Sequence, residues 1–444
     1  MRARPYQLAG LRTMFRSIST VLSGTVLAQG LALLFLPVIS RGFAPADFGA
    51  FQILASAIML LMPFAAMKME FAVLRVRSST QLSDLLALCV LINLAAAAVI
   101  YLGVVLVVPQ IAPGAAGALW ATWMLPAGFL AAGLFQTLTY IPIRNKRYKM
   151  MAVSKVLQSG LFHAGAAVSG LLLAAPSPVL LVGWDIAART LAACIIFADF
   201  LRHRSHRAWT ISVRRMVRIL RAYRRYPLYA VPSSFIGALA AAVPVFTLSY
   251  AHGADAAGQF GMAWRTGFMP LSMIIFAVAQ VVSADLSRIV RDAGGGGRDM
   301  ILKVVRNTVL FGVGPLFVIF VFGETIIAWV LGPQWGEAGR MLQAMVPLLL
   351  AVLIAGPVNM TLVITGATGM QFGWEVARAT LLLTGLWASA AAGLSAVATV
   401  GVFSAVMLIM AIVFLGLALV RIDKRRRPVS KKAKCETPLP SEKA

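Results

Sequence analysis

The stretch SRGFAPADFGAF (Ser40–Phe51) is a short polar break between two long apolar runs. A second stretch, SYAHGADAAGQF (Ser249–Phe260), also lies between two apolar runs, and it repeats a serine, a glycine and a phenylalanine at the same spacing. An even number of apolar runs separates the two stretches. A polar break that recurs in this setting predicts two copies of one helical unit, with both breaks on the same side of the molecule.

The composition indicates that lipid, not water, surrounds most of the chain. Of 444 residues, 60% are hydrophobic and 12% are charged, whereas a soluble protein is about half apolar and a quarter charged. Runs of about 20 apolar residues can cross a hydrocarbon core of about 30 Å, and as helices they satisfy their own backbone there. We therefore predict an all-α polytopic membrane protein with about twelve transmembrane helices, in two parallel six-helix repeats around a central cavity. The boundary within Ala391–Gly401 is weak, so eleven or thirteen helices remain open.

The basic residues predict the orientation in the membrane. The formal net charge is +25, and most of the 40 Lys and Arg residues lie in the N-terminal segment, in alternate connections and in the tail. The remaining connections contain only Arg41 and Arg340. Short basic connections stay in the cytoplasm, so we expect both termini to be cytoplasmic. Topology thus explains the charge, and no nucleic-acid partner is expected.

The predicted organisation has five parts. They are a cytoplasmic N-terminal segment (1–16), an N-lobe of six helices (17–200), a basic amphipathic cytoplasmic linker (201–227), a C-lobe of six helices (228–420) and a basic cytoplasmic tail (421–444). In the linker, Val213, Val217, Leu220 and Tyr223 share one helical face, and arginines cover most of the other. This pattern predicts a helix on the membrane surface against anionic lipid, and the tail is expected to be attracted there too. The alternative is a loop whose arginines only hold it in the cytoplasm.

The cysteine pattern indicates neither a disulfide framework nor a metal site. Cys89 and Cys194 fall inside apolar runs and Cys435 falls in the polar tail, without the spacing of metal ligands. No paired carboxylates stand in the short outer connections, so a membrane glycosyltransferase or polymerase is disfavoured. We expect no enzyme activity, no catalytic residues, no metal and no cofactor.

Several charged residues fall within the predicted spans, where insertion of each costs about 2.5–3.5 kcal/mol. Asp185 and Arg189 stand four residues apart, and Glu375 and Arg378 stand three apart, so each couple could form a neutralising pair on its helix. Lys155 lies near the cytoplasmic end of its span, and its long side chain can reach the interface. Arg265 has no acid near it in sequence and lies about two turns inside the membrane, which predicts a role in lining a cavity.

A cationic cavity indicates an anionic cargo, because arginine offers several directed donors to a phosphate group. We expect the substrate-binding residues to be Arg265, followed by Arg189, Lys155 and Arg378. Acids in the spans could couple transport to a proton or another cation. The coupling candidates are Glu70, Asp185 and Glu375.

Leu22–Val76 resembles the start of the bacterial oligosaccharide/polysaccharide repeat-unit flippases, of the multidrug/oligosaccharidyl-lipid/polysaccharide exporter superfamily. The resemblance is carried by Arg41, Phe43, Pro45, Asp47, Phe48 and Gly49, followed by Lys68, Glu70 and Ala72. Asn145–Ala152 and Leu331–Pro347 resemble the segments that lead into the fifth and tenth helices of that family. We expect Pro45, Gly49 and Gly258 to shape outer turns rather than to touch substrate.

The resemblance implies two lobes with alternating access, and a flippase that moves an undecaprenyl-diphosphate-linked oligosaccharide across the inner membrane. The product would be a surface polysaccharide such as lipopolysaccharide or exopolysaccharide, with a polymerase and glycosyltransferases as expected partners. Two alternatives share the fold, a multidrug/cation antiporter and a lipid II flippase. An antiporter would place acids in the cavity, whereas the charges within the spans here lean towards the cationic.

Overall fold

The computed structural model describes residues 5–76, 78–111, 119–174, 176–203, 211–291 and 296–426. Over these ranges every regular element is a helix, and no strand occurs. Nine stretches of described residues are long and apolar enough to cross a membrane, and the longest of them is Tyr226–Arg291. The predicted all-helical membrane protein is therefore confirmed.

The helices form two groups joined by a short amphipathic helix. The first group is α1 (Pro5–Gly42), α2 (Pro45–Leu61), α3 (Ser79–Ile111), α4 (Leu119–Arg144), α5 (Tyr148–Leu172) and α6 (Pro178–His203). Helix α7 (Val213–Ala222) connects it to the second group. The second group is α8 (Val231–Ala263), α9 (Met269–Arg291), α10 (Gly297–Leu331), α11 (Gly336–Ala344), α12 (Val346–Ala355), α13 (Thr361–Ile364), α14 (Thr368–Ala391) and α15 (Ala396–Arg426).

The described residues provide twelve crossings. The 66 residues of Tyr226–Arg291 are too many for one span, and Gly253, with φ 86° and ψ 178°, divides them. Helices α5 and α14 are not among the nine apolar stretches, although they have 25 and 24 residues and pack along α6 and α15 respectively. Both contain charged side chains, Lys155 in α5 and Glu375 in α14, which lower the hydropathy of helices that still have spanning length.

The two groups repeat one packing pattern. In the first group α1 packs on α5, α3 on α4, and α6 on both α4 and α5. In the second group α8 packs on α14, α10 on α11 and α12, and α15 on both α12 and α14. If α8 stands for α1, α10 for α3, α11 with α12 for α4, α14 for α5 and α15 for α6, each contact recurs. The two parallel six-helix repeats are thus a property of the fold.

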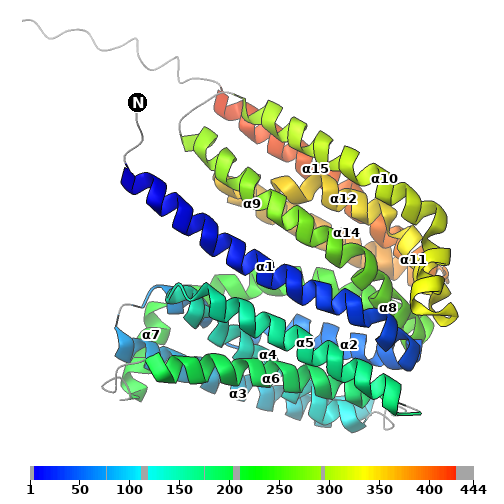
Figure 1. The fold of residues 1–444 in the computed structure, drawn as a ribbon, viewed down its shortest axis with the longest axis horizontal. Helices are drawn as coiled ribbons and strands as arrows, with labels where there is room; N and C mark the ends of the chain where they lie inside the picture. The colour runs from blue at the N-terminus through cyan, green and yellow to red at the C-terminus, as the bar shows by residue number, and fades with distance from the viewer. Residues whose placement is uncertain are drawn as a thin grey trace, which may run out of the picture.

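The groups share a core at one end of the molecule and separate at the other. One hydrophobic cluster includes side chains of both groups, such as Phe48, Phe260 and Trp335. Two further clusters each belong to one side, around Met69 in the first group and around Leu286 in the second. Figure 1 shows the groups converging near α8 and α11 and spreading towards α7, the start of α1 and the end of α15. We call the converging end the closed end.

The two polar breaks of the sequence meet at the closed end. Gly49 lies in α2 and Gly258 lies in α8, and these two helices pack against each other. A Cβ atom on Gly49 would lie 1.7 Å from the carbonyl oxygen of Ala254, and one on Gly258 would lie 2.0 Å from that of Pro45. The expectation that these glycines shape turns is wrong, because both lie within helices. They are glycines because the two backbones touch.

Hydrogen bonds between the groups reinforce the closed end. The Ser40 hydroxyl donates to the carbonyl of Leu331 at 2.8 Å, and the Trp335 indole N–H donates to the carbonyl of Ser40 at 2.7 Å. Within the second group, the Gln259 side chain accepts a bond from the backbone N–H of Ala338 at 2.9 Å and so ties α8 to α11 beside these contacts. All these groups are buried, so the bonds form away from water, where an unpaired group would be costly.

The first helix begins earlier in the chain than the predicted first span. Helix α1 begins at Pro5, so the described part of the predicted N-terminal segment continues the first spanning helix. An apolar window marks only the part of a helix that contacts lipid, and hydrogen bonding carries the helix further. Most of the predicted tail, residues 427–444, lies outside the described residues, as do residues 204–210 of the linker.

The linker forms the expected helix, but its apolar face is divided. In α7, Met216 and Ile219 are buried against the first group. Val213 is 73% exposed and Val217 is 40% exposed, on the face that the sequence pattern assigned to the membrane surface. The protein therefore covers only one edge of the apolar stripe. The other edge faces outward.

Candidate functional site

A cavity of about 400 Å³ opens between helices of the first group and the start of α9. Apolar side chains such as Phe51, Phe162 and Met269 form part of its wall. Its polar lining comes from Thr25, Gln29, Lys155, Gln158, Ser159, His163, Asp185, Arg189 and Arg265. The polar residues of one cavity thus come from α1, α5, α6 and the junction that follows α8.

Helical spacing explains how most of these side chains reach the cavity. Lys155, Ser159 and His163 stand at intervals of four on α5, so they share one face. The ring Nδ1 of His163 donates to the carbonyl of Ser159 at 2.7 Å, which fixes the imidazole along that face. Asp185 and Arg189 stand in the same relation on α6. Two helices of the first group therefore present polar stripes to one space.

Arg265 reaches the cavity from the second group. It lies in a π-helical turn, Trp264–Phe268, between α8 and α9. Such turns re-aim a side chain within a helix and are frequent at functional sites. Only the folded arrangement of the two groups brings Arg265 next to α5 and α6.

The Arg265 guanidinium is held by aromatic rings and an amide. Its central carbon lies 4.7 Å from the ring centroid of Phe48 and 5.2 Å from that of Phe51. Its Nη2 donates to the Gln52 side-chain oxygen at 3.3 Å, a long bond. Within the described chain no carboxylate lies within 4.0 Å of this guanidinium. Cation–π contacts hold its position but leave its charge available to a ligand.

The other cations of this cavity differ in their partners. Arg189 Nε donates to Asp185 Oδ2 at 2.8 Å, so these two form the neutralising pair that their spacing allowed. Lys155 lines the same cavity, and no ion pair to it occurs among the described residues. Three cations therefore face one carboxylate, and the cavity is positive.

Arg378 does not join the other three cations. It lies on α14, where its Nη2 donates to Glu375 Oε2 at 2.5 Å and its guanidinium stands 5.0 Å from the ring of Trp374. This group lines a different cavity of about 440 Å³, whose lining residues all belong to the second group. The sequence placed all four basic residues in one cavity, and the structure divides them between two.

Glu70 lines neither of these cavities. It is 2% exposed, in the 3₁₀ turn Met69–Leu74 that follows α2. Its Oε1 accepts a bond from the Gln136 side chain of α4 at 2.9 Å, and its Oε2 is buried with no partner among the residues that the structure describes. The bond to Gln136 joins the turn after α2 to α4.

The sequence reasoning missed several residues of the cavity. The spacing of Ser159 and His163 from Lys155 was a usable signal, because one helical face carries all three. No sequence signal pointed to Phe48 and Phe51 as the ring pair beside Arg265. That contact exists only because α2 and the junction after α8 pack together.

Comparisons with known proteins agree with this architecture. The family model described as "Polysaccharide biosynthesis protein" matches residues 38–340. No curated protein matches the sequence.

Solved structures show the same fold at low sequence identity. An inward-facing multidrug resistance MATE family transporter of the MOP superfamily superimposes with a TM-score of 0.69, at 14% identity over 90% of this chain and 96% of that one. The inward closed form of the lipid II flippase MurJ gives 0.67, at 13% identity over 91% and 89%. An outward-facing MATE transporter gives 0.60, at 14% identity over 93% and 96%. Transporters of this superfamily therefore share the fold.

Proposed function

Since the chain belongs to the polysaccharide biosynthesis protein family and has the fold of membrane transporters, we propose that it is a flippase for an undecaprenyl-diphosphate-linked oligosaccharide. The observation that carries this proposal is the positive cavity, in which neither Arg265 nor Lys155 forms an ion pair with a described acid. A diphosphate taken into the membrane needs cationic donors, and a guanidinium supplies several at once. Polar residues beside them, such as Gln29 and Gln158, suit sugar hydroxyls.

We assign the proposed roles according to the geometry. Arg265 is the first contact for the diphosphate, with Lys155 and Arg189 beside it. Arg378 lies in the second cavity with its charge already balanced by Glu375, so a contact with glycan suits it better than one with phosphate. Asp185 is the first coupling candidate, because protonating it would free Arg189 inside the cavity. Glu375 and Glu70 are the further candidates.

Alternating access would operate by rocking the two lobes, which we take as residues 17–200 and 228–420. The closed end would face the outside of the bacterial inner membrane, and both termini and the basic linker would face the cytoplasm. Arg265 connects the lobes through Phe48, Phe51 and Gln52. A phosphate forms stronger, charge-assisted bonds than the Gln52 amide, so the substrate would loosen this contact and favour opening outward.

The membrane potential would favour export. A negative charge that moves outward across an inside-negative membrane releases about 2.3 kcal/mol per 100 mV, if it crosses uncompensated. The oligosaccharide would come from cytoplasmic glycosyltransferases and pass to a polysaccharide polymerase outside. The product would be lipopolysaccharide or exopolysaccharide.

The central test is substitution of Arg265. We expect Arg265→Ala to reduce export roughly tenfold to a hundredfold, as the loss of a charged hydrogen-bond partner does, and Arg265→Lys to retain part of it. The measurement is the amount of surface glycan in cells whose membranes contain equal amounts of each variant. Arg340→Ala is the matched control, because Arg340 is 54% exposed at the closed end. Normal surface glycan with Arg265→Ala would remove Arg265 from the mechanism.

Two rival substrates are separated by rescue experiments. Expression in cells depleted of their lipid II flippase should not restore peptidoglycan synthesis, and drug accumulation should be unchanged. Rescue of peptidoglycan would instead assign lipid II, which carries the same diphosphate. A change in drug accumulation would assign a cation antiporter.

A further inference from the structure

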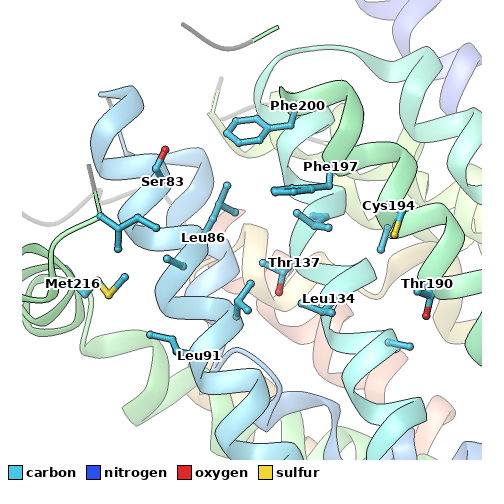
Figure 2. A pocket seen from close by; sticks show the side chains of 16 residues that line it. Ser83, Leu86, Leu91, Leu134, Thr137, Thr190, Cys194, Phe197, Phe200 and Met216 are labelled. Carbon is cyan, nitrogen blue, oxygen red and sulfur yellow. The ribbon is translucent and has the colours of Figure 1, made fainter. Parts of the chain in front are cut away.

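An apolar groove lies on the outside of the first group, away from the polar cavity. It has a volume of about 530 Å³, within the range of small-molecule sites. Figure 2 shows its lining side chains, which include Leu86 and Leu91, Leu134 and Thr137, Phe197 and Phe200, and Met216. They come from α3, α4, α6 and α7. Leu91 is 54% exposed, so the groove is open to the surrounding membrane.

Helix α7 is fixed in place where it borders the groove. The Asp84 carboxylate of α3 is fully buried and accepts bonds from the backbone N–H of Ser212 at 3.0 Å and from Arg215 Nε at 2.5 Å. Met216, one position further, closes one side of the groove. A buried carboxylate with these donors holds the helix in one register. The apolar side chains and the charges of α7 therefore stand at a set distance from the groove.

The exposed faces of α7 match the two halves of a phospholipid. Val213 and Val217 are exposed apolar side chains on α7. Arg214, Arg218 and Arg221 are exposed on the adjoining face, and none forms an ion pair with a described acid. A row of arginines beside an apolar stripe suits the boundary between lipid headgroups and acyl chains.

We propose that the groove holds one acyl chain of an anionic phospholipid, whose headgroup binds the exposed arginines of α7. The lining is apolar, which suits a hydrocarbon chain. Exposed arginines on α7, the helix that borders the groove through Met216, favour a negative headgroup at the membrane surface. This is a defined lipid site and goes beyond a general attraction of the linker to the membrane surface.

The occupant is separate from the transported lipid. On α6 the cavity residues Asp185 and Arg189 lie about a third of a turn away from the groove residues Cys194 and Phe197. A lipid with its phosphates at Arg265 would have to pass its tail across the packed α4–α6 layer to enter the groove. A second lipid meets no such barrier, and the proposal does not depend on the transported substrate.

The groove contains its own probe, Cys194, which is a free and exposed cysteine. In delipidated full-length protein with Cys435→Ser, a thiol reagent should label Cys194, because Cys89 is buried. We expect added phosphatidylglycerol to slow this labelling several-fold more than phosphatidylcholine does. Equal effects of the two lipids, or no effect, would overturn the proposal. This labelling experiment requires no substitution in the groove.

Native mass spectrometry of bound phosphatidylglycerol tests the two halves of the site. Ala87→Phe fills the groove and should abolish the bound lipid, whereas Val99→Phe, on a 69% exposed position of the same helix, should not. Each of Arg214→Gln, Arg218→Gln and Arg221→Gln should weaken binding roughly fivefold. Arg288→Gln, exposed near the end of α9, is the charge control and should have no effect.

The remaining outcomes are also decisive. If Ala87→Phe binds phosphatidylglycerol as well as Val99→Phe, the lipid does not occupy the groove. If wild-type protein instead carries a polyprenyl phosphate that Ala87→Phe displaces, the groove serves the transported lipid and the proposal is wrong. If Ala87→Phe fails to fold, the Cys194 labelling decides alone.

Discussion

At the scale of single residues, the basic side chains inside the membrane differ in what neutralises them. Arg189 and Arg378 each pair with a carboxylate one turn away on the same helix, at 2.8 and 2.5 Å. Such pairs form from local spacing alone and lower the cost of the charge in the membrane. Arg265 and Lys155 face the cavity without such a pair among the described residues. The two unpaired cations therefore give the cavity its charge.

The Asp185–Arg189 pair can be tested with a double-mutant cycle. Arg189→Gln leaves the Asp185 carboxylate, 11% exposed, without its partner, and should lower the free energy of unfolding by about 1–3 kcal/mol. The double variant Asp185→Asn/Arg189→Gln contains no unpaired charge and should recover most of that loss. Thermal unfolding in detergent measures each variant. Strict additivity of the two single changes would show that the pair contributes nothing.

The control for this cycle is an exposed pair. Arg340 and Glu324 lie 3.9 Å apart with side chains 54% and 49% exposed. Because water screens such a pair, Arg340→Gln should change stability by less than about 1 kcal/mol. A larger loss there would mean that removal of any charge destabilises the protein. The double-mutant cycle could then not be interpreted as the energy of the Asp185–Arg189 pair.

At the scale of helices, the crossing of α2 and α8 determines whether the closed end can shut. The two glycines of the repeated polar break let the backbones touch, and no larger residue fits either position. Trp335 packs edge-on against Phe48 next to this crossing, with ring centroids 5.8 Å apart. The same ring of Phe48 supports Arg265. A displacement of the helices at the crossing should therefore also move Arg265 in the cavity, because the Phe48 ring contacts both Trp335 and Arg265.

Gly49→Ala and Gly258→Ala should hold the closed end open. The added methyl group would lie within 2.0 Å of a backbone oxygen, so the helices must separate by roughly 1–2 Å to restore van der Waals contact. Spin labels on Ala46→Cys and Arg340→Cys, in a background without the native cysteines, would report a longer and broader distance distribution. Gly30→Ala is the matched control, because nothing lies within 4 Å of its added Cβ. Unchanged distances in both variants would show that the crossing does not control the closed end.

At the scale of the whole molecule, a shared core at one end and separate cores at the other give two lobes that can rock. Close packing of side chains holds the shared core together around Phe48, Phe260 and Trp335. Each lobe also has a hydrophobic cluster of its own, around Met69 or Leu286. These clusters would keep each lobe folded while the closed end opens. The proposed orientation places the shared core outside, because the basic connections stand at the opposite end (Figure 1).

Reporter fusions test this orientation. A reporter that is active only in the cytoplasm should give a signal when fused after Arg225, which follows α7. The same reporter fused after Ala254, at the second polar break, should give none. The positive-inside rule is the physical reason for both results. Silence after Arg225 together with a signal after Ala254 would invert the proposed topology.

The sequence alone determined the properties that depend on local or one-dimensional patterns. Apolar runs of spanning length predicted the helices, and the recurring break predicted the repeat. Spacing along one helix predicted the pairs at Asp185 and Glu375. These features follow from composition and from the 3.6-residue period, so they require no knowledge of which helices are neighbours.

Only the tertiary structure decided which charges share a cavity and why positions 49 and 258 require glycine. Arg265 meets Lys155 and leaves Arg378 in another cavity because the lobes converge at one end, and Gly49 touches α8 because the two helices cross there. The physical reason is that an apolar helix surface is as favourable against lipid tails as against another helix, so the apolar pattern of one helix does not specify its partner. Close packing between backbones and side chains selects that partner, and packing is a property of pairs of segments far apart in the chain.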